Sequence, residues 1–332
     1  MFWKILILLA LIVALLTLSV PGKQNLEYGA TFSQKFSEEL NGGSDAKVGA
    51  GWKQNYLAIL DDLKIKDLRL VAYWDLIEPA EGQFDFKDLD WQINEAEKRG
   101  AKIILAMGLK VPRWPECHIP DWAKGRDASA RAGRLIKYEE ILINRYKDNK
   151  AVWAWQVENE PYFPFGDCKI VPPAILNAEI KQVKALDSRP IVLTDAGELG
   201  FAWPYLAAKS DIFGTTLYRY INNRFLGDIR YSLIPAYYFR IKALWAGKIL
   251  GKQILISELQ AEPWVSESLA RVPLEKQEKT MNPEIFKEII NYAERSGFPK
   301  AYLWGAEWWY WMKEKQGRPE MWEAARNAIS NL

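Results

Sequence analysis

Two glutamates follow short apolar runs that are rich in β-prone residues, and together they suit one reaction. Glu160 lies in Asn159-Glu160-Pro161, directly after residues 151–157, and Glu258 follows residues 253–257. Because parallel strands end at the same edge of a sheet, carboxyl groups from two strand ends can face one cleft. In such a pair, one group protonates a departing glycosidic oxygen and the other attacks the anomeric carbon. We expect Glu160 to be the acid/base and Glu258 to be the nucleophile.

The elements that must position these carboxyl groups follow from the hydrophobic pattern. Short apolar runs alternate with longer amphipathic segments, which is typical of repeated βα units around a parallel sheet. Near-continuous apolar character indicates strands that are covered on both faces. The expected strands are 28–32, 67–73, 102–107, 151–157, 190–194, 212–218, 253–257 and 301–304. The expected helices are 52–63, 89–99, 128–146, 173–186, 203–209, 236–246, 283–295 and 319–329.

Eight such units predict a closed (β/α)8 TIM barrel, with one catalytic domain over residues 25–332. A length of 332 residues suits a single barrel, and no linker or low-complexity segment divides the chain. A doubly wound open sheet is the alternative. The first expected strand, 28–32, holds one glycine and is followed by no glycine-rich phosphate loop, which favours the barrel.

Composition narrows the class of ligand. The net charge is +2 with Lys and Arg spread among Asp and Glu, so a nucleic-acid partner is not expected. The chain has 16 Trp, 15 Tyr and 13 Phe, more than a core of this size needs, and aromatic rings stack on sugars. A carbohydrate partner is expected, and a Trp-rich core is the alternative reading. With His118 as the one histidine, a Ser-His-Asp site or a multi-histidine metal site is disfavoured, and we expect no cofactor and no metal.

The N-terminus carries a targeting signal. Residues 5–20 are apolar and stand between Lys4 and Lys23, which predicts a signal peptide or membrane anchor over residues 1–24. Small residues only half form a cleavage site at Val20-Pro21-Gly22, which favours an uncleaved anchor. The expected protein is extracytoplasmic, anchored or secreted, and monomeric, with possible membrane association through residues 5–20.

Cysteine usage fits an exported protein. The chain has two cysteines, Cys117 and Cys168, which excludes a disulfide-dense scaffold and a cysteine-based metal site. Two unpaired thiols are one reading. The exported context favours a single disulfide.

The motifs resemble a clan of barrel enzymes, the retaining glycoside hydrolases whose acid/base sits in Asn-Glu-Pro on strand four and whose nucleophile ends strand seven. Asn159-Glu160-Pro161 and Ile256-Ser257-Glu258 carry this resemblance. It implies that Arg69 holds the nucleophile, that Tyr218 donates a hydrogen bond to it, and that Trp304 lies under the bound sugar. Asn159 is expected to bind a sugar hydroxyl. Further aromatic residues in loops after strands are expected to bind substrate: Trp74, Trp114 and Trp308.

The resemblance holds for the clan, and no family is singled out. Residues 74–79 with Gly82, Phe84 and Asp85 are similar to the second loop of families 5, 39 and 42. Family 5 enzymes usually carry histidines on strands three and six, whereas this chain has none at 102–107 and has Thr216-Leu217-Tyr218 on strand six.

Several alternatives stay open. Glu262, Glu307 or Asp195 could replace Glu258 as the nucleophile, and Glu158 is expected to be an outward, salt-bridged residue. The Trp308 to Trp311 cluster could be a packed lid or a sugar platform. A catalytically inactive barrel that binds surface polysaccharide is the alternative function. A metal-dependent sugar isomerase would need more histidines and clustered acids.

Overall fold

The computed structural model describes residues 3, 23–42, 51–168, 170–223, 227–265 and 267–330. The apolar run 5–20, predicted to be a signal peptide or anchor, lies outside these described residues. Within the described part of the chain, no helix is both long and apolar enough to cross a membrane.

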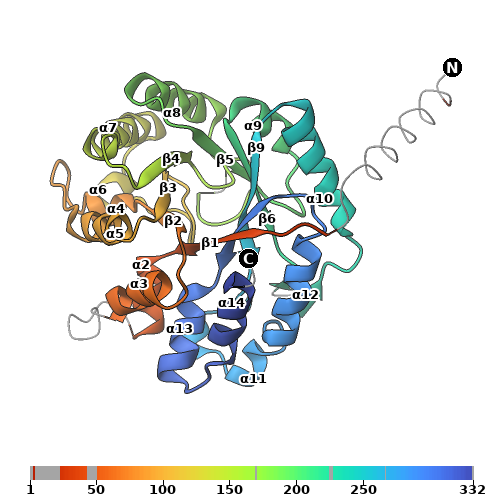
Figure 1. Cartoon of the computed structure of the whole chain (residues 1–332). Coiled ribbons are helices and arrows are strands. Elements are labelled where there is room, and N and C mark those ends of the chain that lie inside the picture. The colour runs from red at the N-terminus through yellow and green to blue at the C-terminus, as the bar shows by residue number, and fades with distance from the viewer. Residues whose placement is uncertain are drawn as a thin grey trace.

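Eight parallel strands form a closed barrel in the order β1-β10-β9-β6-β5-β4-β3-β2, and helices surround it (Figure 1). This confirms the predicted (β/α)8 barrel. The strands are β1 (Glu27–Phe32), β2 (Asp67–Val71), β3 (Lys102–Met107), β4 (Val152–Val157), β5 (Ile191–Asp195), β6 (Ile212–Leu217), β9 (Gln253–Gln260) and β10 (Lys300–Trp304). Side chains that alternate along these strands face the barrel interior, where Ile104, Ala154, Val192 and Tyr302 pack together.

The eight expected helices are present. They are α3 (Gly51–Asp61), α5 (Lys87–Lys98), α7 (Ala128–Tyr146), α8 (Pro173–Leu186), α9 (Trp203–Lys209), α10 (Ala236–Ala243), α12 (Pro283–Ala293) and α14 (Glu320–Ser330). Of these, α7, α8 and α9 have the expected bounds, and the other five are shifted at one or both ends by one to three residues. Local capping explains two of the starts. Asp127 accepts a hydrogen bond from the Ala130 N–H before α7, and Asn282 accepts one from the Ile285 N–H before α12.

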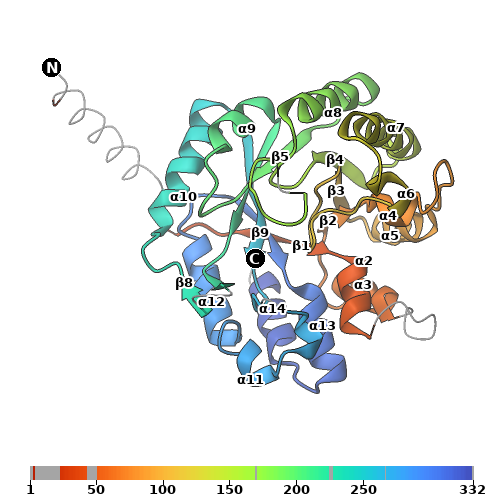
Figure 2. The ribbon, with the colours of Figure 1, turned by 180° about the vertical axis from the view of Figure 1, so that it is seen from behind.

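The structure adds elements that the hydrophobic pattern did not predict. They are α2 (Gln34–Leu40), α4 (Trp74–Ile77), α6 (Asp121–Lys124), α11 (Leu274–Gln277) and α13 (Ala306–Lys315), and the hairpin β7 (Tyr220–Asn223) with β8 (Gly227–Arg230). A π-helical turn, Leu244–Ile249, continues α10. Seen from behind, β8 lies near α12 at the edge of the barrel (Figure 2).

One strand boundary needs correction, because β9 continues to Gln260 and Glu258 lies inside it. The pairing with β6 shifts register there: Thr215 pairs with Ile256, and Thr216 pairs with Glu258. Ser257 is therefore an extra residue, as in a β-bulge, which re-aims the side chain that follows. The bulge explains how a residue within a strand can present its carboxyl group at the barrel mouth.

Candidate active site

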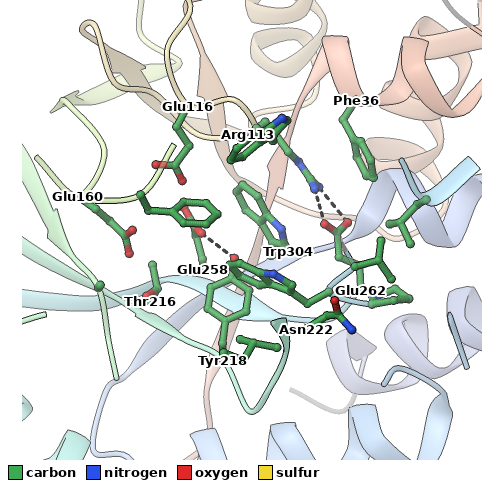
Figure 3. A pocket seen from close by; sticks show the side chains of 18 of the residues that line it. Phe36, Arg113, Glu116, Glu160, Thr216, Tyr218, Asn222, Glu258, Glu262 and Trp304 are labelled. Carbon is green, nitrogen blue, oxygen red and sulfur yellow. Dashed lines mark hydrogen bonds and ion pairs between the residues drawn. The ribbon is translucent and has the colours of Figure 1, made fainter. Parts of the chain in front are cut away.

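A cavity of about 820 Å³ lies at the carboxyl ends of the strands. Its lining includes both predicted carboxyl groups, Glu160 and Glu258, together with Tyr218 and Trp304 (Figure 3). Glu160 follows β4, Glu258 lies in β9, Tyr218 follows β6 and Trp304 ends β10. The structure thus brings together residues that are far apart in the sequence, at the face where barrel enzymes hold their active sites.

Glu258 is held by two hydrogen-bond donors. Arg69 Nη1 lies 2.9 Å from Glu258 Oε1, and Tyr218 Oη lies 2.8 Å from Glu258 Oε2. Both side chains of the ion pair are almost fully buried. An adjacent guanidinium and a donated hydroxyl both stabilise the charged form of a carboxyl group. Burial and the nearby charge of Glu258 raise the pKa of Tyr218, which keeps Tyr218 a proton donor.

Arg69 also fixes the strand that carries the second carboxyl group. Its Nη2 donates to Asn159 Oδ1 at 2.7 Å, and its Nε donates to Gln156 Oε1 at 2.7 Å. Asn159 is fully buried, and Arg69 is too. One guanidinium therefore ties the end of β4 to Glu258 on β9. Neither Arg69 nor Asn159 is part of the cavity lining, so a contact of Asn159 with a sugar hydroxyl stays a prediction.

The surroundings of Glu160 favour the neutral form of its carboxyl group, whereas Glu258 is bound by a guanidinium. The Glu160 side chain is buried, and burial, followed by the charges of Glu116 and Glu258, raises its pKa well above the usual range. Its backbone N–H donates to Thr194 Oγ1 at 3.0 Å, and its φ of 45° lies in the left-handed region. A carboxyl group with a raised pKa in the same cavity as one that is bound by a guanidinium is the arrangement that an acid and a nucleophile require.

Another carboxyl group in the lining of the same cavity, Glu116, was missed by the sequence analysis. Lys110 Nζ lies 3.2 Å from Glu116 Oε2 and donates to the backbone carbonyls of Glu160 at 3.1 Å and Phe163 at 2.8 Å. Burial raises the pKa of Glu116 to about 7 even though Lys110 opposes the shift. Lys110 and Glu116 belong to an irregular loop after β3, where no periodicity marks them in the sequence.

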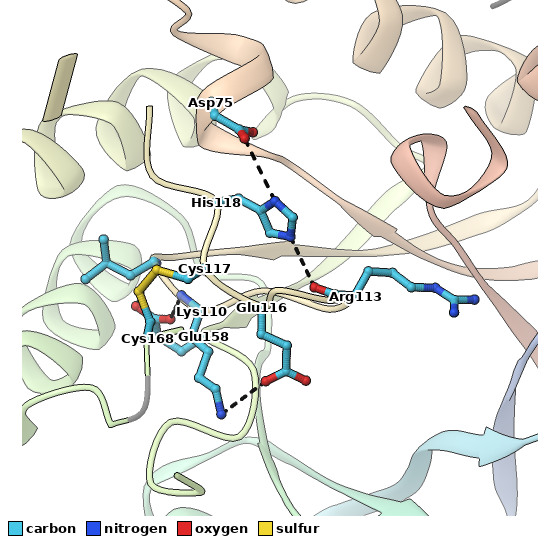
Figure 4. Close-up of a disulfide and its surroundings, with 9 residues drawn as sticks. Asp75, Lys110, Arg113, Glu116, Cys117, His118, Glu158 and Cys168 are labelled. Carbon is cyan, nitrogen blue, oxygen red and sulfur yellow. Dashed lines mark hydrogen bonds and ion pairs between the residues drawn. A yellow bond between two sulfur atoms is a disulfide. The ribbon is translucent and has the colours of Figure 1, made fainter. Parts of the chain in front are cut away.

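A disulfide joins Cys117 to Cys168, with the Cα atoms 5.1 Å apart, as predicted (Figure 4). It links the loop that carries Glu116 to the segment that follows Glu160. His118, next in the chain, contacts the Tyr73 ring at 4.6 Å and lies outside the cavity lining. Its Nε2 lies 3.1 Å from the Arg113 carbonyl oxygen, so His118 has a structural role in the loop.

Arg113 forms the wall opposite Glu160. Its guanidinium lies 3.9 Å from the Phe36 ring centre and 4.0 Å from that of Trp304, and it forms ion pairs with Glu262 and Glu307. Glu262 and Glu307, the two glutamates that could replace Glu258 as the nucleophile, are thus both bound to the Arg113 guanidinium. The third alternative, Asp195, is buried outside the cavity lining. Figure 3 shows the carboxyl groups of Glu116 and Glu258 near Glu160, and Glu258 is the one that Arg69 and Tyr218 hold.

The expected aromatic binding residues divide into two groups. Trp304 and Trp114 line the cavity, and Trp114 is 68% exposed. The prediction for Trp74 and Trp308 is wrong: both are fully buried, and their indole N–H groups donate to Glu78 and Gln277. Trp308 lies in α13, which packs into the core, so neither a lid nor a sugar platform describes it.

Glu158 is also misplaced by the sequence analysis. It is fully buried, and its two carboxylate oxygens accept hydrogen bonds from the N–H groups of Leu109 at 2.9 Å and Lys110 at 2.6 Å. It therefore anchors the loop after β3 from within. Across the described ranges, no cluster of His, Cys, Asp and Glu has an arrangement that could hold a metal ion.

Comparison with solved structures shows the same architecture. A beta-galactosidase from Halorubrum lacusprofundi aligns with 92% of this chain and 58% of its own, at a TM-score of 0.61 and 12% identity. Xylanase 10B from Thermotoga petrophila RKU-1 aligns with 92% of this chain and 94% of its own, at a TM-score of 0.57 and 16% identity. These likenesses show a shared fold.

Sequence matches to curated relatives cover only part of the chain, and these relatives are named as glycosidases. Beta-galactosidase BgaA from Clostridium cellulovorans is 29% identical over 120 residues, which are 31% of this chain and 18% of the relative. Mannan endo-1,4-beta-mannosidase A from Emericella nidulans is 25% identical over 150 residues, which are 41% of this chain and 37% of the relative. The chain thus spans well under half the length of these two curated relatives.

The closed barrel defines the class by fold, and over part of its length this (β/α)8-barrel protein is similar to glycoside hydrolases. Residues 52–169 match the Glyco_hydro_42 family model, which is described as beta-galactosidase. The matched segment includes Glu116 and Glu160 and ends before β9.

Proposed function

We propose that this protein is a retaining β-glycosidase that acts by double displacement on an oligo- or polysaccharide. One observation carries the proposal: two buried carboxyl groups share a cavity, and one is held by a cation while the other has a strongly raised pKa. That contrast is the division of labour between a nucleophile and an acid. A retaining enzyme further requires the two carboxyl groups to lie about 5–5.5 Å apart, which stays a prediction for this site.

In the first step, a Glu258 oxygen attacks the anomeric carbon while Glu160 gives its proton to the departing oxygen. Arg69 and Tyr218 hold Glu258 in place, so the attacking oxygen is oriented before the substrate arrives. The products are a covalent glycosyl-enzyme and a free leaving group.

In the second step, Glu160, now ionised, takes a proton from water, and the water oxygen attacks the same carbon. The bond to Glu258 breaks, Glu160 regains its proton, and the sugar keeps its β configuration. Trp304 lies on the cavity wall, where its ring can support one face of the sugar.

The substrate class follows from the cavity and the relatives. A volume of about 820 Å³ is within the range of ligand pockets that enclose a molecule of several rings. The matched relatives are named as beta-galactosidases and mannan endo-beta-mannosidases. We propose a β-linked hexose unit in the site, and a screen of aryl β-galactosides, aryl β-mannosides and β-mannan will identify the sugar.

The site of action is proposed to be outside the cytoplasm, with the domain at residues 25–332 and the segment 1–24 as an anchor or a cleaved signal. The apolar sequence at 5–20 and the Cys117–Cys168 disulfide support this, because disulfides persist in oxidising compartments. Mass spectrometry of the mature N-terminus tests the anchor, since a chain that begins near Lys23 would contradict it. A monomer is proposed, and light scattering of the purified protein tests it.

The decisive experiment replaces Glu258 by alanine. Hydrolysis of an activated aryl β-glycoside should fall to background, and azide should restore turnover by forming the α-glycosyl azide, because azide fills the space of the missing carboxylate. Glu267→Gln is the matched control, since Glu267 lines the same cavity but is exposed at its rim. Full activity of the Glu258→Ala variant would refute the assignment. Glycan binding without turnover in the unaltered protein would favour the inactive-barrel alternative.

A further inference from the structure

The outer face of α10 and its π-helical turn carries large apolar side chains in a line. The side chains follow one another at intervals of four residues: Tyr237, Ile241, Trp245 and Ile249. Tyr237 is 57% exposed, Trp245 is 36% exposed and Ile249 is 59% exposed. A helical rise of about 1.5 Å per residue makes this line roughly 18 Å long. We call these four residues the α10 stripe.

Nearby aromatic residues widen the α10 stripe. Trp245 packs edge to face against Trp203 of α9, with the ring centres 5.7 Å apart. Trp203 is half-buried, and Leu233, just before α10, is 94% exposed. Apolar side chains on two adjacent elements thus face solvent together, and such an exposed patch marks an interaction surface.

The sequence around the α10 stripe is basic, although Arg230 is paired with Glu288 of α12 at 2.5 Å. Between Asp228 and Glu258 the sequence contains no acidic residue but five basic ones: Arg230, Arg240, Lys242, Lys248 and Lys252. Lys242 turns inward and donates to the Gly197 carbonyl, whereas Lys248 is exposed in the π-helical turn beside Ile249. A helical face with apolar and aromatic residues and a basic flank is the pattern of a segment that lies on an anionic membrane surface.

The described segment 23–42 begins beside this face. The Gln24 N–H donates to the Glu294 carbonyl at 2.9 Å, and Arg240 of α10 donates to the carbonyl of the next residue, Arg295, at 2.7 Å. Both views show α10 next to the start of the β1 segment (Figures 1 and 2). The apolar run 5–20, proposed above as an anchor, ends only a few residues before Gln24.

We propose that the α10 stripe rests on the anionic headgroup region of a membrane, with its aromatic rings at the interface and Lys248 against lipid phosphates. Because α10 runs along the side of the barrel, this contact leaves the cavity mouth uncovered. The barrel would lie on its side and present its active site to glycans close to the lipid surface. The contact does not depend on catalysis.

The test uses the full-length chain in proteoliposomes. Tyr237→Cys and Ile249→Cys each receive an environment-sensitive NBD dye, which reacts with the new thiol because the native cysteines are paired. In vesicles that contain phosphatidylglycerol, emission from both positions should rise severalfold, shift to shorter wavelength and be quenched by nitroxide-labelled lipid. Asp121→Cys is the control, since its side chain is 93% exposed on α6, and it should show none of these changes.

Charge dependence separates lipid from other partners. Adding Lys248→Glu to the labelled Tyr237→Cys protein should remove most of the response, and high salt should weaken it in the unaltered stripe. Unchanged emission at positions 237 and 249 in every lipid would overturn the proposal. Shielding that instead grows with protein concentration in detergent would also overturn it, in favour of a second copy of the chain. Hydrolysis of an aryl glycoside, measured in parallel, should be the same in all these variants, so a failure here is distinct from a failure of the proposed activity.

Discussion

Glu116 gives the sharpest test of the electrostatics at this site. It lines the cavity with Glu160 and Glu258, and its charge is the largest cause of the raised pKa of Glu160 after burial. Glu116→Gln removes this charge and leaves the positive charge of the nearby Lys110 ammonium without its ion-pair partner. Both changes favour the ionised form of Glu160, so the pKa of Glu160 must fall.

The size of the effect can be worked out from the buried geometry. A single charge close to a carboxyl group shifts its pKa by about 1–3 units, and one unit corresponds to about 1.4 kcal/mol. Because Lys110 already offsets part of the Glu116 charge, we expect the lower end, about one unit. Glu160 works as an acid when protonated, so the alkaline limb of the pH profile of kcat/KM should move to lower pH by about one unit.

The assay measures kcat/KM against pH with a substrate whose leaving group is poor, so that proton donation limits the rate. Glu116 and Glu160 titrate as a coupled pair, and the limb therefore belongs to the pair. The rim variant Glu267→Gln should leave the limb in place. An alkaline limb that stays put or moves to higher pH in Glu116→Gln would refute the reasoning.

Three further predictions concern single contacts. Tyr218→Phe removes a 2.8 Å hydrogen bond to the Glu258 carboxylate, which should lower kcat/KM by roughly 10–100-fold at unchanged melting temperature; an unchanged rate would contradict the role of that hydroxyl. Glu160→Ala should slow hydrolysis of poor leaving groups by about 10²–10⁴-fold while formation of the glycosyl-enzyme from a dinitrophenyl glycoside stays fast; equal losses for both substrates would argue against an acid role. Replacing Cys117 and Cys168 by serine should lower the free energy of unfolding by about 2–4 kcal/mol in denaturant titrations; an unchanged midpoint would show that the bridge adds no stability.

The barrel could be predicted from the sequence because βα alternation is a local, repeated signal. Apolar runs such as 102–107 and amphipathic runs such as 128–146 match β3 and α7 residue for residue. Glu160 and Glu258 could be predicted too, since each lies at or near the end of such a run. The register shift at Ser257 could not be predicted from the local sequence, because a bulge arises from pairing with neighbouring strands.

Local sequence patterns do not predict which loop side chains reach the cavity. Trp74 and Trp308 follow strands just as Trp114 does, yet only Trp114 reaches the cavity. Whether an indole is buried depends on what packs over it, and the sequence near it does not carry that information. The same holds for Glu116 and Lys110, which meet only because the loop after β3 folds back against the end of β4.

The Cys117–Cys168 disulfide affects when in the life of the protein the cleft reaches its final structure. It adds a covalent link between the loop of Glu116 and the chain beyond Glu160, two segments that hydrogen bonds also join, and this link forms only on oxidation. If the chain is exported as proposed, its precursor meets a reducing cytoplasm first, and the thiols stay separate there. The loop that carries Glu116 would then gain its covalent link only outside the cell. The active site of the proposed hydrolase would be fully ordered only in the compartment that holds its substrate.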